Sequence, residues 1–177
     1  MKTSIRPAQK NDATELAGFF IKAQKLMWEL SPQGFGETLK RSSSRRKEEQ
    51  RFIEELKDKS QVTFVALSED KGIVGFITGC IEKYPDDLLT APYLTLAYIY
   101  VDEKCRRQGV AQGLIQQLAA WARKKKIKTM ELTVWSNNEK AKSLFKNSGY
   151  QPLQIRMAKK LKPLKPTFHN HLFRKSK

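Results

Sequence analysis

The 177-residue sequence lacks several features that would place it in other classes of protein. It has no run of about 18 apolar residues, which argues against a transmembrane helix. Its first residues, MKTSIRPAQKND, lack the apolar stretch of a secretory signal peptide. Cys80 and Cys105 are its only cysteines, too few for a disulfide framework. We find no internal repeat. Together these absences favour one domain in a reducing cytoplasm.

The sequence also lacks a cluster of metal ligands. His169 and His171 are its only histidines, and they form a His-x-His without a nearby cysteine or acidic residue. Structural zinc sites need four such ligands. We therefore predict no metal site, and we expect the two histidines to lie in an exposed polar tail.

Acidic residues are scarce, since 18 Asp and Glu stand against 34 Lys and Arg, for a net charge of +16. Seven of the basic residues and no acidic one occur from Lys159 onward, and other basic clusters lie at Arg41–Lys47, Lys104–Arg107 and Arg123–Lys128. Such a charge favours an acidic partner, nucleic acid or an anionic membrane surface. No aromatic residues interleave the clusters as single-strand binders require, so a solvated basic surface is the simpler interpretation.

The most informative stretch runs from Leu94 to Lys126. It begins with an aromatic and β-branched segment, Leu94–Val101, typical of a strand. After a short polar loop, apolar residues at helical spacing predict a helix: Val110, Ala111, Leu114, Ile115, Leu118 and Ala122. A strand that enters a helix through a basic turn with Gly109 points several free backbone N–H groups at one spot. The sequence therefore predicts an anion site at this turn.

The remaining pattern predicts an α/β fold with a mixed central sheet of about six to seven strands and flanking helices. Expected strands cover 3–6, 62–67, 73–81, 94–101, 129–135 and 150–157; expected helices cover 12–31, 44–59, 108–125 and 138–146. Asp12 and Glu15 have the spacing of a capping box for the first helix. Gly75 and Gly79 mark bulges or close approaches in their strand. We expect residues 1–161 to form the domain and residues 162–177 a basic, partly disordered extension.

Two motifs in this order resemble the signatures of the GNAT N-acetyltransferase superfamily. The first is Arg106-x-x-Gly109-x-Ala111. The second follows about thirty residues later as a strand, Asn138-x-x-Ala141, then Leu144-Phe145 and Gly149-Tyr150. The resemblance covers about residues 2–161, and its second half is the better match. It implies a GNAT-like fold in which the first turn holds the pyrophosphate of acetyl-coenzyme A, used as a co-substrate.

The resemblance also implies which residues hold that cofactor. In the family the strands matching 94–101 and 129–135 splay apart, and the pantetheine arm enters the gap along the edge of the first strand. The implied binding residues are Ile99, Tyr100, Val101, Arg106, Arg107, Gln108, Gly109, Val110, Ala111, Asn138, Ala141 and Phe145. Asn138 can serve as a helix cap at the same time. Dimers are frequent in the family, so a homodimer is an open alternative to a monomer.

The catalytic residues are harder to assign. Acetyl transfer from a thioester requires a neutral amine, a donor for the developing oxyanion and a proton or dipole for the leaving thiolate. The family often has a Tyr at the position of Phe145 as the acid, so here Tyr98, Tyr100, Tyr150 or water must serve instead. The family's central-strand Glu is matched by Thr95, which cannot act as a base. The strand carboxylates Glu82 and Glu131, with Tyr98, are the remaining candidates for catalytic residues.

The favoured function is therefore N-acetylation of a primary amine by direct transfer in a ternary complex. Trp28 and Phe35, near the family's variable acceptor region, are candidates for the acceptor pocket or for the core. One alternative is a non-catalytic binder of acyl-coenzyme A on the same fold. Another is association with RNA or the ribosome through the tail and the Arg41–Lys47 cluster.

Overall fold

The computed structural model describes residues 2–31, 44–84 and 91–159. Phe35, Arg41 and the extension 162–177 therefore lie outside the described residues. The strands are β1 (Thr3–Pro7), β2 (Gln61–Ser68), β3 (Gly72–Glu82), β4 (Tyr93–Val101) and β5 (Met130–Glu131). The helices are α1 (Ala13–Glu29), α2 (Arg45–Glu55), α3 (Val110–Lys124) and α4 (Glu139–Asn147), with short 3₁₀ helices η1 (Lys10–Asp12) and η3 (Glu103–Cys105).

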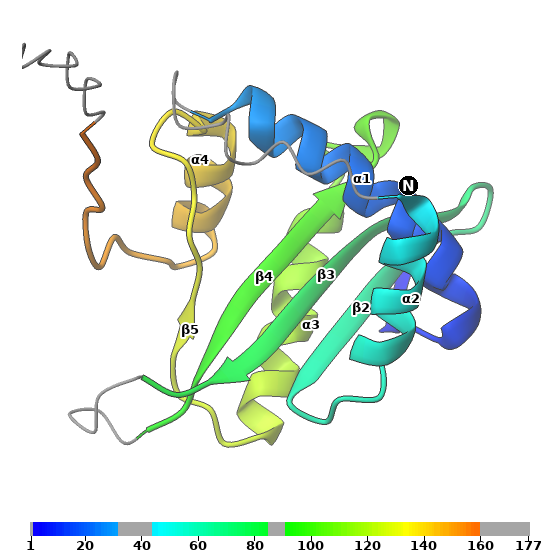
Figure 1. The fold of residues 1–177 in the computed structure, drawn as a ribbon, viewed down its shortest axis with the longest axis horizontal. Helices are drawn as coiled ribbons and strands as arrows, with labels where there is room; N and C mark the ends of the chain where they lie inside the picture. Colours follow the sequence, from blue (N-terminus) through cyan, green and yellow to red (C-terminus); the bar gives the residue numbers. More distant parts are fainter. Residues whose placement is uncertain (1, 32–43, 85–90, 160–177) are drawn as a thin grey trace, which may run out of the picture.

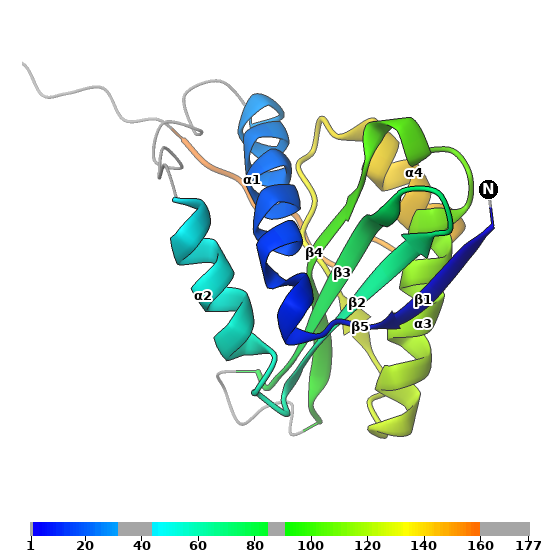
Figure 2. The ribbon, with the colours of Figure 1, turned by 90° about the vertical axis from the view of Figure 1, so that its right-hand side faces the viewer.

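The strands form one mixed sheet in the order β1-β2-β3-β4-β5. The first four pair antiparallel, whereas β5 pairs parallel to β4 after the α3 crossover. Helices α1 and α2 cover one face of the sheet and α3 covers the other, as Figures 1 and 2 show from two sides. Helix α4 lies beyond the end of β5, beside the carboxyl end of β4 (Figure 1). The predicted α/β class is thus confirmed.

Each face of the sheet has its own hydrophobic core. The α3 core includes Leu94, Leu96 and Val101 of β4 together with Leu114 and Leu118 of α3. The α1/α2 core is richer in aromatic rings: Phe19 and Phe20 of α1, Phe52 of α2, Phe76 of β3 and Tyr100 of β4. Because alternate residues of a strand point to opposite faces, β4 supplies side chains to both cores.

A β-bulge interrupts the pairing of β3 with β4. The register passes from Thr78↔Tyr98 to Gly79↔Leu96, which leaves Ala97 without a partner on β3. Gly79 is also a point of close approach, because a Cβ there would lie 2.6 Å from Cδ1 of Leu118 on α3. At Gly75 a Cβ would lie 2.7 Å from the carbonyl oxygen of Tyr100. The two glycines therefore play the roles predicted for them.

The gap between β4 and β5 opens immediately after a short paired segment. Only Leu94↔Met130 and Thr95↔Glu131 are in register. The predicted strand 129–135 is therefore shorter than expected, and residues 96–101 of β4 have no strand beside them on the β5 side. This divergence lies next to the bulge at Ala97, so the backbone groups in the middle of β4 are not paired with a described strand on the β5 side.

Two other expectations are wrong. The segment 150–157 forms no strand, which is why the described sheet has five strands rather than six or seven. Asp12 does not cap α1; its carboxylate instead accepts hydrogen bonds from Arg6 and from the Gln9 backbone N–H at 2.7 Å. The hydrogen bond from the Arg6 guanidinium is the main cause that lowers the pKa of Asp12, and the hydrogen bond from the Gln9 backbone N–H lowers it further. Burial of the carboxyl group opposes both effects.

Candidate functional site

The turn between β4 and α3 is shaped by two left-handed residues. Arg107 has φ 61° and Gly109 has φ 79°. Such values are unusual for a residue with a side chain, and they cluster at functional sites. The first i→i+4 hydrogen bond of α3 runs from the Gly113 N–H to the Gly109 carbonyl at 2.9 Å. The backbone N–H groups before Gly113 therefore have no acceptor within the helix, and they point outward from its N-terminal end.

Gly109 itself faces open space. A Cβ at this position would meet no atom within 4 Å. The protein's own packing therefore does not require glycine; the backbone angle favours it. A ligand lying on the turn would add a second reason, because a side chain would hold it away from the amides.

Arg106 and Arg107 are both exposed, but only Arg106 is tied to neighbouring groups by contacts among the described residues. The Arg106 Nε donates to the Val101 carbonyl at 3.0 Å, and its Nη1 lies 3.6 Å from a Glu103 carboxylate oxygen. Its guanidinium also lies 5.7 Å from the centroid of the Tyr100 ring. The Val101 carbonyl is thus already used, although this strand edge is the predicted path of the pantetheine arm. Arg107 has no ion-pair partner in the described ranges, so its guanidinium is not held by a carboxylate there.

The second motif brings α4 to the same end of the sheet. The Asn138 Oδ1 accepts from the Ala141 N–H at 3.2 Å, so Asn138 caps α4 as expected. Phe145 is buried in the α3 core, and its ring meets Tyr150 edge to face with centroids 5.6 Å apart. Val101 and Val110 belong to that core, and Ile99, Ala111 and Ala141 pack against it. Gln108 is exposed, and its side-chain amide donates to the Lys104 carbonyl at 3.3 Å.

The Tyr150 hydroxyl is an anomaly in this cluster. It is buried and has no hydrogen-bond partner among the described residues. Burial raises the pKa of this phenol to about 12, so it keeps its proton throughout the physiological range. A buried hydroxyl without a partner is costly unless something else receives its proton. Trp135, whose indole N–H is also buried without a partner, lies in the segment that leads from β5 to α4.

The opposite face of the sheet carries a charged cluster that the sequence did not reveal. The Arg51 guanidinium lies over the rings of Phe20, Phe52 and Tyr98, at 4.1, 4.7 and 5.4 Å from their centroids. Its Nε and Nη1 each donate at 2.7 Å, to the carboxylates of Glu48 and Glu55. These three charged residues sit three and four positions apart on α2, and that spacing is the only trace of the cluster in the sequence.

Glu55 is the unusual member of this cluster. Its Oε1 accepts from Arg51, but its Oε2 is buried with no hydrogen-bond partner in the described part of the chain, as is Nη2 of Arg51. Burial raises the pKa of the Glu55 carboxyl, and the neighbouring Arg51 only partly offsets this. Burial raises the pKa of both Tyr98 and Cys80, and the nearby Glu55 charge adds to the rise in each.

The base candidates Glu82 and Glu131 lie at the far end of the same face. The Tyr93 hydroxyl donates a hydrogen bond to the Glu82 carboxylate at 3.0 Å. The Tyr84 hydroxyl donates one to the Glu131 carboxylate. The two tyrosine rings stack with centroids 4.3 Å apart. Glu82 and Glu131 are therefore brought together with each other, but each already accepts a hydrogen bond from a tyrosine hydroxyl. Tyr98 lies instead beside Glu55 and the bulge.

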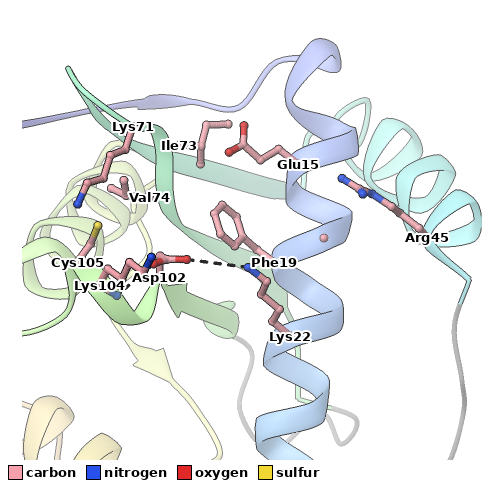
Figure 3. Close-up of a pocket in the computed structure, with 11 residues that line it drawn as sticks. Glu15, Phe19, Lys22, Arg45, Lys71, Ile73, Val74, Asp102, Lys104 and Cys105 are labelled. Atoms are coloured by element: carbon pink, nitrogen blue, oxygen red, sulfur yellow. Dashed lines mark hydrogen bonds and ion pairs between the residues drawn. The ribbon is translucent and has the colours of Figure 1, made fainter.

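A cavity of about 420 Å³ lies between α1 and the segment before the turn (Figure 3). Its lining includes Lys22 and Phe19 of α1, Lys71 and Asp102, and the buried thiol of Cys105. Lys22 lies 4.0 Å from an Asp102 carboxylate oxygen and so links α1 to this segment. The cavity contains none of the residues predicted to hold the cofactor, and it lies on the α1 side of the sheet.

Known proteins place the chain in a family. A sequence model of the acetyltransferase (GNAT) family matches residues 23–150. The chain belongs to the GNAT acetyltransferase family. It is thus an acetyl-CoA-dependent acetyltransferase, and the matched range includes both the turn at Gly109 and the α4 motif. No curated protein sequence matches the chain.

Solved structures share the GNAT fold at low sequence identity. A tetramutant of the BH1408 protein from Bacillus halodurans has a TM-score of 0.78 and 18% identity, covering 89% of this chain and 99% of its own. The aminoglycoside 6'-N-acetyltransferase AAC(6')-Ih from Acinetobacter baumannii has a TM-score of 0.67 and 16% identity over 93% and 100% of the chains. AAC(6')-Iy, solved with CoA, has a TM-score of 0.71 and 18% identity over 92% and 96%.

Two further features bear on partners. Within residues 2–31, 44–84 and 91–159, no helix is long and apolar enough to cross a membrane. The same ranges contain no group of three His, Cys, Asp or Glu side chains placed to hold a metal ion.

Trp28, at the end of α1, is 43% exposed and so is not a core residue.

Proposed function

We propose that this GNAT protein moves an acetyl group from acetyl-CoA to a primary amine by direct transfer while both substrates are bound. The observation that carries the proposal is the turn at Arg107–Gly109. Two residues with left-handed backbone angles lead the chain there directly into the start of α3. A diphosphate suits this point because backbone N–H groups and the helix dipole favour a negative charge. Binding both reactants side by side supplies much of the rate.

The cofactor would lie along the gap between β4 and β5. The amides of Gln108, Gly109, Val110 and Ala111 would hold the diphosphate, with the Arg107 guanidinium beside it. The unpaired edge of β4 from Leu96 onward would receive the pantetheine arm, which runs as an extended chain and can hydrogen-bond like a strand. The apolar side chains of Ile99, Ala141 and Phe145 would border it. The bulge at Ala97 would then lie near the thioester.

We assign the role of base to Glu55 rather than to Glu82 or Glu131. An acceptor ammonium must lose a proton before its nitrogen can attack, and the acceptor of that proton works best with a pKa near the working pH. Glu55 has the raised pKa and a carboxylate oxygen without a partner. It lies beside Tyr98, which follows the bulge. The carboxylates of Glu82 and Glu131 already accept tyrosine hydroxyls at the other end of the face.

The proton balance of the transfer can be written with these groups. Glu55 takes one proton from the acceptor ammonium, and the neutral nitrogen attacks the thioester carbon. The C–S bond breaks as the C–N bond becomes an amide, and the second nitrogen proton passes to the leaving sulfur. Glu55 then returns its proton to solvent. The Tyr150 phenol, on the cofactor side, would donate a hydrogen bond to the sulfur without losing its own proton, because its pKa is about 12.

The acceptor would approach from the α1/α2 face. Three of the described carboxylates there, those of Glu55, Glu82 and Glu131, suit a protonated amine although the chain as a whole is basic. Several fold neighbours, such as AAC(6')-Ih, act on aminoglycosides, whose amines are cationic. A small amine with more than one positive charge is therefore the acceptor class that we expect.

Thiol release from acetyl-CoA tests the proposal. The full chain is assayed with spermidine, kanamycin, tyramine and Nα-acetyllysine amide, with product mass measured for each. We expect amine-dependent release of thiol and a product heavier by one acetyl group. Tight acetyl-CoA binding without release in the presence of any of these amines would favour the non-catalytic binder. Failure to bind acetyl-CoA would refute both functions, the acetyltransferase and the non-catalytic binder.

A further inference from the structure

The cavity beside α1 takes no part in the transfer proposed above, yet it has the size and lining of a binding site. Its volume of about 420 Å³ lies within the range of about 300–1,000 Å³ that small-molecule sites occupy. Phe19, Ile73 and Val74 line it and are buried, so they form an apolar floor. Charged side chains lie around that floor in Figure 3. A site of this kind suits a ligand that has an apolar body and a charged end.

The charged lining is positive on balance. Four basic side chains and two acidic ones line the cavity, an excess of two positive charges. The basic ones come from four separate parts of the fold: Lys22 of α1, Arg45 of α2, Lys71 of the turn between β2 and β3, and Lys104 of η3. Like charges that line one cavity repel one another, and an anion placed among them relieves that repulsion. The lining therefore favours an anionic ligand.

The charges of the basic side chains are mostly not neutralised within the protein. Neither Lys71 nor Lys104 has an ion-pair partner among the described residues. Lys22 has only a loose one, because its Nζ lies 4.0 Å from an Asp102 carboxylate oxygen. The Arg45 guanidinium donates to a backbone carbonyl at 3.3 Å, which leaves its charge in place. An anion in the cavity would thus not have to displace a strong salt bridge.

The two acidic side chains oppose an anion to different degrees. Asp102 is engaged, since one carboxylate oxygen accepts from the Lys104 backbone N–H at 3.1 Å and the other lies toward Lys22. Glu15 has no ion-pair partner in the part of the chain that the structure describes. Removing the Glu15 charge should therefore strengthen the binding of an anion, whereas removing a lysine charge should weaken it.

We propose that this cavity binds a small organic phosphomonoester, with its phosphate among Lys22, Lys71 and Lys104 and its apolar body on the buried floor. A phosphomonoester carries a charge of about −1.5 to −2 near pH 7, which matches the excess of two positive charges. Its three terminal oxygens can each accept from a different ammonium group. The site is separate from the turn at Gly109, because none of the residues expected to hold the cofactor lines the cavity.

Calorimetric titration of the full chain tests the proposal with three probes. Phenyl phosphate has both the dianion and the apolar body, inorganic phosphate lacks the body, and benzoate carries a single charge. Each probe is titrated in low and in moderate salt, and phenyl phosphate also in the presence of saturating acetyl-CoA. We expect phenyl phosphate to bind with a Kd below about 1 mM in low salt, more weakly in moderate salt, and at least about tenfold more tightly than either other probe.

Single substitutions at exposed positions then locate the site. Lys71→Gln and Lys22→Gln should each raise the Kd of phenyl phosphate about threefold to fivefold. Lys25→Gln is the matched control, because Lys25 is exposed on the same helix as Lys22, three positions away, and does not line the cavity. It should leave the Kd unchanged, and Glu15→Gln should lower it about threefold.

Several results would overturn the proposal. One is a Kd for phenyl phosphate above about 10 mM, and another is inorganic phosphate or benzoate binding as tightly as phenyl phosphate. An equal loss of affinity in Lys25→Gln and Lys22→Gln would mean that the basic surface attracts the probe without a defined site. If saturating acetyl-CoA abolishes phenyl phosphate binding, and Lys71→Gln weakens acetyl-CoA as well, the cavity belongs to the cofactor site. None of these outcomes depends on acetyl transfer.

Discussion

The two faces of the sheet differ in how they are built. On the α3 face, side chains from β4, α3 and α4 form an apolar core, and the turn that we propose to hold the cofactor presents backbone amides. On the α1/α2 face, the groups that face the bulge are side chains: Arg51 against three rings, flanked by Glu48 and Glu55. One face thus offers the geometry of the main chain, and the other offers charge.

This difference separates a general task from a specific one. A backbone cradle depends on φ and ψ and tolerates many sequences, provided that Gly109 can adopt its left-handed conformation. A charged cluster depends on each of its members, because removing one leaves a buried charge without its partner. We therefore expect substitutions on the α3 face to act on cofactor affinity or on stability, and substitutions at Glu55 to act on the chemical step.

The largest expected effect is on cofactor affinity. Gly109→Asp strains a left-handed backbone and sets a carboxylate against the diphosphate, which together should cost about 3 kcal/mol of binding, or roughly 100-fold in Kd. Gly72→Asp is the matched control, because Gly72 also has a positive φ, 69°, and open space around its Cβ position. Calorimetric titration with acetyl-CoA measures both variants. Equal affinities would show that the turn does not hold the cofactor.

The second effect is on turnover. Glu55→Gln removes the base, and kcat with the best acceptor should fall about 100-fold at neutral pH. Glu48→Gln breaks the other arm of the same Arg51 bridge and should change kcat only a few-fold. Acetyl-CoA affinity should be unaltered in both, and their melting temperatures show how much of any loss is structural.

The pH profile sharpens this test. Glu55 must be ionised to accept a proton, so kcat of the parent should fall as the pH drops through its raised pKa. Arg51 and Glu48 on α2, Tyr98 on β4 and Cys80 on β3 surround it. The loss of kcat in Glu55→Gln relative to the parent should shrink as the pH rises, because more of the acceptor amine is neutral in solution. A deficit that is constant with pH would mean that Glu55 only supports the fold.

The third effect is on stability alone. Gly79→Ala places a methyl group 2.6 Å from Leu118 Cδ1 in the α3 core, and overpacking of this kind should cost about 2 kcal/mol of unfolding free energy. Gly113→Ala meets only the tip of Ile5, at 3.1 Å, and gains helix propensity. Its unfolding free energy should change by less than about 1 kcal/mol. Urea denaturation compares the two, and similar losses in both would contradict the tight contact of α3 with β3.

The smallest effect has opposite signs for stability and activity. Tyr150→Phe removes a buried hydroxyl without a partner, so the free protein should be unchanged or stabilised by up to about 1 kcal/mol. Loss of its hydrogen bond to the leaving sulfur should lower kcat about tenfold. A destabilised Tyr150→Phe with normal kcat would place the hydroxyl in the fold and not in the reaction.

The sequence predicted the features that local patterns encode. Helix α3 followed from its apolar spacing, the tight turn from Gly109 between a strand and that helix, and the cap of α4 from Asn138. The close approach at Gly79 was also anticipated, because glycine inside a strand indicates one.

The sequence could not reveal contacts between distant segments. Arg51 meets Tyr98 across 47 positions, and no local pattern encodes that the two share a face. The apolar and polar residues of segment 150–157 alternate as in a strand, but this alternation does not specify which sheet edge the segment would pair with. In the structure the segment forms no strand. Asp12 has a capping-box partner at Glu15 in the sequence, but the guanidinium of Arg6 binds its carboxylate instead.

The central claim is that backbone amides at the start of α3 hold the cofactor, and an amide-resolved NMR titration tests it most directly. Nitrogen-labelled full chain is titrated with acetyl-CoA, and the shift of each backbone N–H is followed. We predict that the largest changes fall on Gln108, Gly109, Val110 and Ala111, with smaller ones on β4 beyond Leu96. Changes centred instead on Lys22 and Lys104, around the cavity beside α1, would contradict the account.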